Sequence, residues 1–191
     1  MSHLFAYFAR MKFIRRWGLM HNTYPENVQE HSLRTAQVAH CLALIRSRGE
    51  ADVDPGRVAL LAMFHDVGEV ITGDLPSPIK YFNPDIKDAY KKIEGSATET
   101  LLEMVPEDLA DDYRAVLDQS RWSATERKLV KAADKICAYM KCLEETAAGN
   151  REFARAEDSL RAAVEGIDLP EARVFVDIFV PSLRLTLDDL R

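Results

Sequence analysis

The sequence predicts an all-α protein, and three observations favour that class. Apolar residues recur at helical spacing along most of the 191 residues, and several of these segments follow a polar N-cap residue. Neither internal repeats nor Gly/Ser-rich linkers divide the chain. With 47% hydrophobic residues, the chain is long enough to bury one substantial core. We therefore expect a single domain over residues 1–191, built as a helical bundle.

The first 25 residues differ from the rest because they contain no acidic residue. They include Arg10, Lys12, Arg15 and Arg16, as a targeting presequence would. However, the stretch is rich in aromatic residues, is poor in serine and continues into the next helix without a linker. These features favour a structural helix inside the fold.

Capping signals mark the start of the next three helices. Asn27 and Glu30 have the spacing of a capping box and predict a helix over 28–47. Asp54-Pro55 predicts the start of a helix that ends with "LLAMFHD", at residues 65 and 66. Asn83-Pro84 repeats this arrangement before "DIKDAYKKIEGSATETLLEMV".

A second capping box precedes the longest helix. Ser123 and Glu126 predict its start before "RKLVKAADKICAYMKCLEETAA", and Gly149 predicts its end. Further helices are expected over 107–119, 151–165 and 170–180, the last stopped by Pro181. The stretch "RVFVDIFV" also alternates like a strand, but a lone strand would have nothing to pair with, so we expect a helix.

The overall charge and the cysteine content exclude some functions. A formal net charge of −6 and a pI near 5.4 argue against a general nucleic-acid or membrane-surface binder. No apolar run approaches the roughly 20 residues that span a bilayer. Cys41, Cys137 and Cys142 form no C-x-x-C pair, which suits a reducing compartment and predicts a cytoplasmic protein.

Three predicted helices direct histidine or aspartate inward. His31 begins an apolar stripe, the adjacent His65 and Asp66 follow buried positions, and Asp134 lies on the apolar face of the longest helix. Taken singly, each has a structural explanation, as a hydrogen-bonded core histidine, a cap or half of an ion pair. Together, two imidazoles and two carboxylates form a suitable ligand set for a divalent metal, which would offset their burial cost.

One irregular segment follows these residues. "GEVITGDLPSPIKYFNP", residues 68–84, is rich in Gly, Pro and Asp, and loops on a rigid scaffold commonly hold binding groups. Glu69 lies four residues after His65, the spacing that places two side chains on one helix face. A solvated helix end is the structural alternative for Glu69.

The order His31, His65-Asp66, Asp134 matches the H…HD…D signature of the HD-domain phosphohydrolases. The chain resembles the bacterial 5′-deoxynucleotidase branch of that superfamily over nearly its whole length. The motifs that support this resemblance are "RRWGLM", "ENVQEHS", "LLAMFHDVGEVITGDLPSPIKYF", "VPEDL", "LVKAADKICAYMKCLEE", "AAGN" and "IFVPS". Gly68 departs from the pattern, since related proteins tend to have a small residue with a side chain there.

The resemblance implies an HD-type helical fold, a homodimer and hydrolysis of deoxyribonucleoside 5′-monophosphates to nucleoside and phosphate. The expected metal ligands are His31, His65, Asp66 and Asp134, around one divalent cation: cobalt, manganese, zinc, iron or magnesium. The five histidines lie at positions 3, 21, 31, 40 and 65, so the chain after His65 has none to hold a second ion.

The remaining site residues are expected to act on the substrate. Glu69 and, by resemblance, Asp74 are the candidate catalytic carboxylates that orient water or move protons, and their division of roles stays open. Arg16 is the candidate phosphate clamp, and Lys80 is a weaker one. The residues expected to contact substrate are Arg16, Trp17, His31, Asp74, Leu75, Pro76, Lys80 and Asp134.

Trp17 is the expected source of sugar selectivity. Its structural alternative is an aromatic residue that packs in the core. In the resembling family the corresponding tryptophan crowds the place of a ribose 2′-hydroxyl, and Leu75 and Pro76 could shape the same pocket. Two alternatives remain at this stage. One is another nucleotide as the substrate, namely a triphosphate, guanosine tetraphosphate or a cyclic nucleotide. The other is a non-catalytic nucleotide-binding module.

Overall fold

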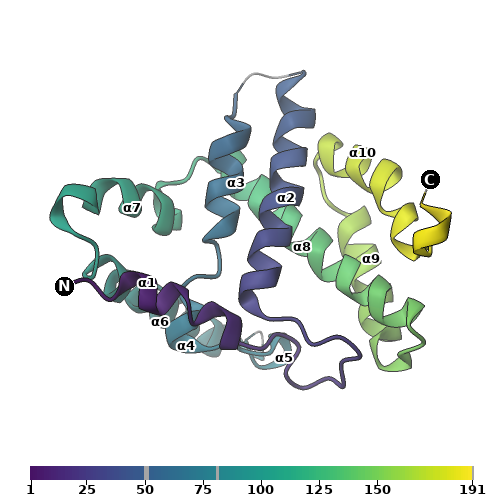
Figure 1. The fold of residues 1–191 in the computed structure, drawn as a ribbon, viewed down its shortest axis with the longest axis horizontal. Coiled ribbons are helices and arrows are strands. Elements are labelled where there is room, and N and C mark those ends of the chain that lie inside the picture. Colours follow the sequence, from purple (N-terminus) through teal and green to yellow (C-terminus); the bar gives the residue numbers. More distant parts are fainter. Residues whose placement is uncertain (50–51, 81, 191) are drawn as a thin grey trace.

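Helices make up the regular structure of this protein, as the computed structural model in Figure 1 shows; it describes residues 1–49, 52–80 and 82–190. Within these ranges there is no strand, and the only extended pairing is an isolated bridge between Arg15 and Asn27. The predicted all-α, single-domain class is confirmed. None of the described helices is long and apolar enough to cross a membrane.

Three long helices form the centre of the fold: α2 (Val28–Ser47), α3 (Pro55–Met63) and α8 (Ala124–Ala147). α2 packs against both α3 and α8, and α3 also contacts α8. The apolar stripes that the sequence predicted face one another here, because Leu42, Leu61, Leu129 and Ile136 are completely buried in one core. α9 (Ala154–Glu165) and α10 (Pro170–Phe179) extend this core toward the C-terminus (Figure 1).

A second, smaller core lies on the other side of the molecule. It joins α1 (Leu4–Phe8), α6 (Pro84–Leu102) and α7 (Ala110–Leu117) through Leu4, Leu101 and Leu117. The remaining short elements are α4 (Glu69–Thr72), α5 (Ser77–Lys80) and the 3₁₀ turns η1 (Met11–Phe13), η2 (Glu107–Leu109), η3 (Gln119–Arg121), η4 (Arg151–Phe153), η5 (Pro181–Arg184) and η6 (Leu187–Asp189).

The predicted helix starts agree with the structure. Both capping boxes, Asn27 with Glu30 and Ser123 with Glu126, are formed in both directions. Asp54 and Asn83 cap α3 and α6 through their side chains. α8 ends at Ala147, and Gly149 then adopts a positive φ of 86°, as the predicted stop signal requires. "RVFVDIFV" is helical, in α10 and its end.

Several predicted ends were wrong. α3 ends at Met63 because Phe64 leaves the helical region, with φ −108° and ψ 6°, so His65 and Asp66 lie in the turn between α3 and α4 rather than in the helix. The irregular segment 68–84 contains α4 and α5, and its residue 81 lies outside the described residues. α6 ends three residues early, and the helices expected over 107–119 and 151–165 begin as 3₁₀ turns.

The N-terminal expectation is only partly correct. α1 and η1 are short and pack into the fold, but residues 14–27 form a loop, so Arg16 and Trp17 are not helical. The Arg15–Asn27 bridge and the bond from the Arg16 N–H to the Glu26 carbonyl, 3.0 Å, close the base of this loop. The loop therefore begins and ends beside the N-terminus of α2, where His31 lies.

Candidate metal centre

The structure brings together the four side chains that the sequence singled out as metal ligands. His31 comes from α2, His65 and Asp66 from the turn after α3, and Asp134 from α8. His31 Nε2 lies 3.0 Å from Asp134 Oδ1 and 3.7 Å from Asp66 Oδ2. His65 Nε2 lies 3.1 Å from Asp66 Oδ2 and 3.9 Å from Asp134 Oδ1. Three segments of the chain that are far apart in the sequence thus meet at one point.

The local backbone orients the two imidazoles. His65 Nδ1 lies 2.7 Å from the Ala62 carbonyl, which can only accept, so Nδ1 bears a proton and Nε2 is the ring nitrogen that faces the centre. The same carbonyl also accepts the backbone N–H of His65, at 3.4 Å, in the turn that follows the end of α3. His31 is fully buried, and its ring centroid is 5.2 Å from that of His65.

The charges of the four side chains balance one another. Burial alone would raise the pKa of Asp66, but the neighbouring His65 lowers it to about 2. Burial likewise opposes the ionisation of Asp134, yet contacts from His31 and His65 hold its pKa well below the usual range. Burial disfavours the His65 cation, but Asp66 and Asp134 raise its pKa well above the ordinary value. Two anionic carboxylates therefore face two imidazoles, and the imidazoles are buried while the side chains of Asp66 and Asp134 are 22% and 41% exposed.

This donor set fits a divalent cation. One ligand atom each of His31, His65 and Asp66 lies within 4.8 Å of the others, and Asp134 contacts both imidazoles. His65 Nε2 and His31 Nδ1 are buried without a hydrogen-bond partner in the described structure. Unpaired buried nitrogen is costly, and a cation at His65 Nε2 would remove that cost. The residues present therefore suit a metal centre with nitrogen and oxygen ligands.

Arg16 connects this centre to the N-terminal loop. Its Nη1 donates to Asp66 Oδ2 at 3.2 Å, and its Nε donates to Glu26 Oε2 at 3.2 Å. Trp17 Nε1 donates to the same Glu26 oxygen at 3.3 Å. A guanidinium held on two sides by carboxylates keeps a fixed direction beside the centre. Arg16 is therefore placed where an oxyanion on the metal could reach it.

Trp17 has an unusual backbone conformation. Its φ of 57° lies in the left-handed region, which a bulky residue seldom adopts. Its indole packs on Phe153, with ring centroids 5.4 Å apart. Such a conformation persists only when surrounding contacts impose it, and it is commonly found at functional sites.

The two candidate catalytic carboxylates follow Asp66 along the chain. Glu69 is the first residue of α4, and its buried Oε2 has no hydrogen-bond partner in the described structure. Burial, together with the charges of Asp66 and Asp74, raises the pKa of Glu69 to about 9. Burial also raises the pKa of Asp74, while Arg16 opposes that change. The charge of Asp66 at the candidate metal centre therefore contributes to the raised pKa values of both Glu69 and Asp74.

The other predicted substrate residues are more dispersed. Leu75 and Pro76 are half-buried in the connection between α4 and α5. Lys80 Nζ lies 2.7 Å from Glu94 Oε1 and 4.8 Å from the centre of the Tyr90 ring, so its charge forms an ion pair and a cation–π contact with residues of α6. Lys80 is therefore tied to α6, which weakens its case as a phosphate clamp.

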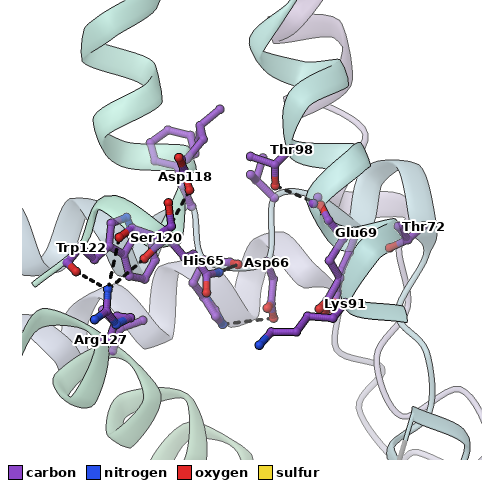
Figure 2. A pocket seen from close by; sticks show the side chains of 18 of the residues that line it. His65, Asp66, Glu69, Thr72, Lys91, Thr98, Asp118, Ser120, Trp122 and Arg127 are labelled. Atoms are coloured by element: carbon purple, nitrogen blue, oxygen red, sulfur yellow. Dashed lines mark hydrogen bonds and ion pairs between the residues drawn. The ribbon is translucent and has the colours of Figure 1, made fainter. Parts of the chain in front are cut away.

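A cavity of about 560 Å³ opens beside the centre. His65, Asp66, Glu69 and Asp134 line it, together with residues of α6, η3 and the start of α8. In Figure 2, His65 and Asp66 lie between Asp118, Ser120, Trp122 and Arg127 on one side and Glu69, Thr72, Lys91 and Thr98 on the other. Arg16, Trp17 and Asp74 are not among its lining residues.

Sequence reasoning missed two supporting residues. Glu26 is buried and accepts from both Arg16 and Trp17, but it reads in the sequence as a loop acid before the Asn27 cap. Gln119 Nε2 donates to the His65 carbonyl at 2.9 Å and holds the turn after α3. Only the motif "ENVQEHS" included Glu26, and no spacing rule marks Gln119.

Solved structures show which fold this is. An HD-domain phosphohydrolase from Listeria innocua superposes with a TM-score of 0.80 at 22% identity, over 94% of this chain and 87% of that one. The cyanophage S-2L HD phosphohydrolase DatZ, bound to dA and one catalytic Zn²⁺ ion, has a TM-score of 0.64 at 20% identity, covering 95% and 96%. The fold is that of the HD-domain phosphohydrolases.

Sequence comparison places the chain within that class. The model of the YfbR-like 5′-deoxynucleotidase family matches residues 3–183, and the chain belongs to this family. A 5′-deoxynucleotidase of Yersinia pestis (strain Pestoides F) is 51% identical over 191 residues, which is 100% of this chain and 97% of the relative. The 5′-deoxynucleotidase of Yersinia pseudotuberculosis serotype O:3 has the same identity and coverage. The predicted resemblance is confirmed.

Proposed function

We propose that this enzyme removes the 5′-phosphate from deoxyribonucleoside 5′-monophosphates and releases deoxynucleoside and phosphate. The observation that supports this proposal most strongly is the convergence of His31, His65, Asp66 and Asp134 beside Arg16. It occurs in a chain 51% identical, over its full length, to proteins named 5′-deoxynucleotidase.

The metal centre would hold one divalent cation through His31 Nε2, His65 Nε2 and the carboxylates of Asp66 and Asp134. Bound there, the cation supplies Lewis acidity toward a phosphate oxygen and lowers the pKa of water. Cobalt, manganese, zinc, iron and magnesium are the candidates, because histidine and carboxylate ligands accept all of them.

The protein side chains would orient the phosphate and move protons. Arg16, fixed by Glu26 and Asp66, would donate to the phosphate oxygens. A water oxygen forms a bond to phosphorus as the bond from phosphorus to the 5′-oxygen breaks. The water proton would pass to a carboxylate and the 5′-oxygen would gain one, and Glu69 and Asp74 are the groups to which we assign this transfer.

Trp17 would provide selectivity for deoxyribose. Its indole is held between Glu26 and Phe153, so it cannot easily move away from an added 2′-hydroxyl. Leu75 and Pro76 would complete the sugar pocket. A steric wall of this kind excludes a ribose without contacting the base.

A phosphate-release assay tests the function. The enzyme is treated with a chelator, dialysed and assayed on deoxy- and ribonucleoside monophosphates, a nucleoside triphosphate, guanosine tetraphosphate and a cyclic nucleotide, with each candidate metal added separately. We expect turnover only with metal and fastest on deoxynucleoside monophosphates. Faster turnover of a triphosphate, guanosine tetraphosphate or a cyclic nucleotide would reject the proposed substrate.

Substitution at the centre separates this enzyme from a passive nucleotide-binding module. Asp134→Ala should lower kcat by about a thousandfold or more, since it removes a ligand that also contacts both imidazoles. Asp112→Ala, an exposed aspartate of α7, is the matched control and should keep full activity. Equal turnover by Asp134→Ala and wild type would show that the reaction does not require the candidate metal centre.

We further propose a cytoplasmic homodimer. The free cysteines include Cys137 and Cys142, whose pKa values burial raises to about 12, so both thiols are unreactive. Phe5 and Phe13 near the N-terminus are 70% and 62% exposed, and Ile178 of α10 is 61% exposed, so these faces are the candidate contacts. Light scattering of wild type against Phe5→Glu and Ile178→Glu tests the assembly, and a monomeric wild type would reject it.

A further inference from the structure

The loop that presents Trp17 is anchored at a second point, at residues of α8 other than the candidate metal ligand Asp134. We define the Trp17 loop as residues 17–26. Its base is closed by the Arg16–Glu26 backbone bond of 3.0 Å, and inside it the Asn22 amide donates to the carbonyls of Trp17 and Met20 at 3.2 and 2.8 Å. These internal bonds fix the turn but do not fix its direction relative to the helices.

A buried ion pair on α8 provides the second anchor. Lys141 and Glu145 lie one helical turn apart, with 2% and 0% of their surfaces exposed, and Lys141 Nζ donates to Glu145 Oε1. Replacing such a pair with apolar residues often costs little stability, so stability alone does not explain why a buried ion pair occupies this position. The contacts of Glu145 and Lys141 with the Trp17 loop provide that explanation.

The carboxylate of Glu145 is saturated by donors, two of them from the Trp17 loop. Its Oε2 accepts the Thr23 N–H at 2.9 Å, and its Oε1 accepts the Tyr24 N–H at 3.1 Å. Asn150 Nδ2 donates to Oε2 at 2.7 Å and also to the His21 carbonyl at 2.8 Å. Lys141 donates to the Tyr24 carbonyl. The backbone over 21–24 is therefore bound to the C-terminal end of α8.

A side-chain route also joins Lys141 to Trp17. The fully buried ring of Phe153 lies 5.5 Å from Lys141 Nζ, a cation–π distance, and its centroid is 5.4 Å from that of Trp17. The indole is thus supported from behind by a ring that the buried cation contacts. Together the two routes can impose the positive φ of Trp17.

We infer that the buried Lys141–Glu145 pair is a positioning device for sugar selectivity, which holds the indole of Trp17 against the 2′ position of the substrate. This inference rests on the proposed function, because it presupposes that the indole of Trp17 excludes the 2′-hydroxyl of a ribonucleotide. Lys141 and Glu145 act through the Trp17 loop and through Phe153. Within the part of the chain that the structure describes, neither residue forms a hydrogen bond or ion pair with Arg16 or with the four proposed metal ligands.

The test compares Glu145→Gln with wild type, Trp17→Ala and Glu157→Gln. Glu157→Gln is the matched control because Glu157 is also a buried carboxylate with a hydroxyl and a cation as partners, Thr146 and Arg184, outside the Trp17 loop. Asn150→Ala is a milder second variant, which removes the bonds to His21 and Glu145 and the cap on the Glu152 N–H but leaves Glu145 paired with Lys141. All variants are assayed on a deoxynucleoside monophosphate and on its ribo counterpart, with thermal unfolding and metal content measured in parallel.

We expect Glu145→Gln to reduce the ratio of kcat/KM for deoxyribo over ribo substrate by about tenfold, and Asn150→Ala by somewhat less. The kcat on the deoxy substrate and the metal content should stay close to wild type. Hydrogen exchange of the amides of residues 17–26 should become faster in both variants and stay unchanged in Glu157→Gln.

Two results would overturn the inference, and they are distinguishable from failure of the proposed function. If Trp17→Ala loses the deoxyribose preference but Glu145→Gln and Asn150→Ala keep it, the pair stabilises the fold without positioning the wall. If the Trp17 loop exchanges no faster in either variant, the anchor is absent. If wild type shows no preference for deoxyribose, or if Trp17→Ala keeps that preference, the role of Trp17 in the proposed function is rejected. The inference about Lys141 and Glu145 is then rejected as well.

Discussion

A single carboxylate oxygen of Glu26 organises two of the residues that would contact substrate. Glu26 Oε2 accepts from Arg16 Nε at 3.2 Å and from Trp17 Nε1 at 3.3 Å. One is the proposed phosphate clamp and the other the proposed sugar wall, and a buried charge-assisted bond fixes both directions. Glu26 therefore connects binding of the phosphate with selection of the sugar.

Glu26→Gln should raise KM for deoxynucleoside monophosphates about tenfold, because the amide carbonyl oxygen can still accept from Arg16 and Trp17 but the charge that strengthens the bond to Arg16 is lost. The bound metal should be retained, since Glu26 is not among the ligands. Steady-state kinetics and metal analysis on the same preparation check this. An unchanged KM would mean that Arg16 is held well enough by Asp66 alone.

The buried carboxylate of Glu145 predicts a defined acid sensitivity. Burial would raise the pKa of Glu145, but Lys141, Asn150 and the N–H groups of Thr23 and Tyr24 lower it to about 2 from an ordinary 4.5. A group with a depressed folded-state pKa contributes stability above its unfolded pKa, and this contribution is lost as pH falls toward the folded value. Glu145 thus stabilises the fold fully above about pH 4.5.

Thermal unfolding as a function of pH measures this contribution. The difference in Tm between wild type and Glu145→Gln should be largest near neutral pH and should shrink as the pH falls from about 4.5 toward 2. Glu157→Gln serves as the comparison at each pH. A constant difference between wild type and Glu145→Gln across this range would show that Glu145 has no depressed pKa in the folded protein.

At the scale of the elements, α8 depends on its capping box. Ser123 accepts the Glu126 N–H at 3.1 Å, and the Glu126 carboxylate accepts the Ser123 N–H at 2.6 Å. Ser123→Ala should lower the free energy of unfolding by about 1 kcal/mol. Urea unfolding monitored by circular dichroism checks the value. Activity should stay unchanged because Asp134 lies about three turns further along α8, and a large loss of activity would contradict this separation.

Sequence reasoning predicted helix starts better than helix ends. Starts depend on a local side-chain cap, such as Asn27 or Asp54, and such caps can be read from residue types and spacing. The end of α3 at Met63 has no such side-chain signal, because Phe64 leaves the helical region and the His65 imidazole then bonds back to the Ala62 carbonyl. Short helices such as α4 and α5 have too few residues to show a period, so the segment around Asp74 appeared irregular.

The same distinction applies to the candidate site. His31, His65, Asp66 and Asp134 were predictable because ionisable residues at inward positions of several helices are rare. Glu26 and Lys141 could not be predicted as supports for Trp17. Glu26 belongs to a loop whose path is set by pairing of Arg15 with Asn27, and Lys141 reads as one of many helix lysines until the loop folds onto it.

At the scale of the whole molecule, the metal centre joins helices from distant parts of the chain. α2, the turn after α3 and α8 each contribute proposed ligands, so a bound cation would hold together the three helices of the main core. A ligand that binds only the folded state stabilises it, by about 2.7 kcal/mol when its concentration is a hundredfold above Kd. Metal binding is therefore expected to stabilise the entire fold.

Chelation should consequently lower Tm by about 5–10 °C for a chain of this size, and re-addition of the preferred metal should restore it. Differential scanning calorimetry of wild type with and without metal measures the shift. Asp134→Ala is the control and should respond to neither treatment. An identical metal-dependent shift in Asp134→Ala would place the stabilising ion elsewhere on the molecule.

In the proposed mechanism, four side chains from three segments hold one cation that the reaction requires. Elemental analysis of purified, active enzyme, combined with phosphate release from a deoxynucleoside monophosphate by the same sample, tests it most directly. We predict about one divalent ion per chain, with ion and activity lost together in His65→Ala and Asp134→Ala. Full activity in a preparation that contains no divalent ion would contradict the claim.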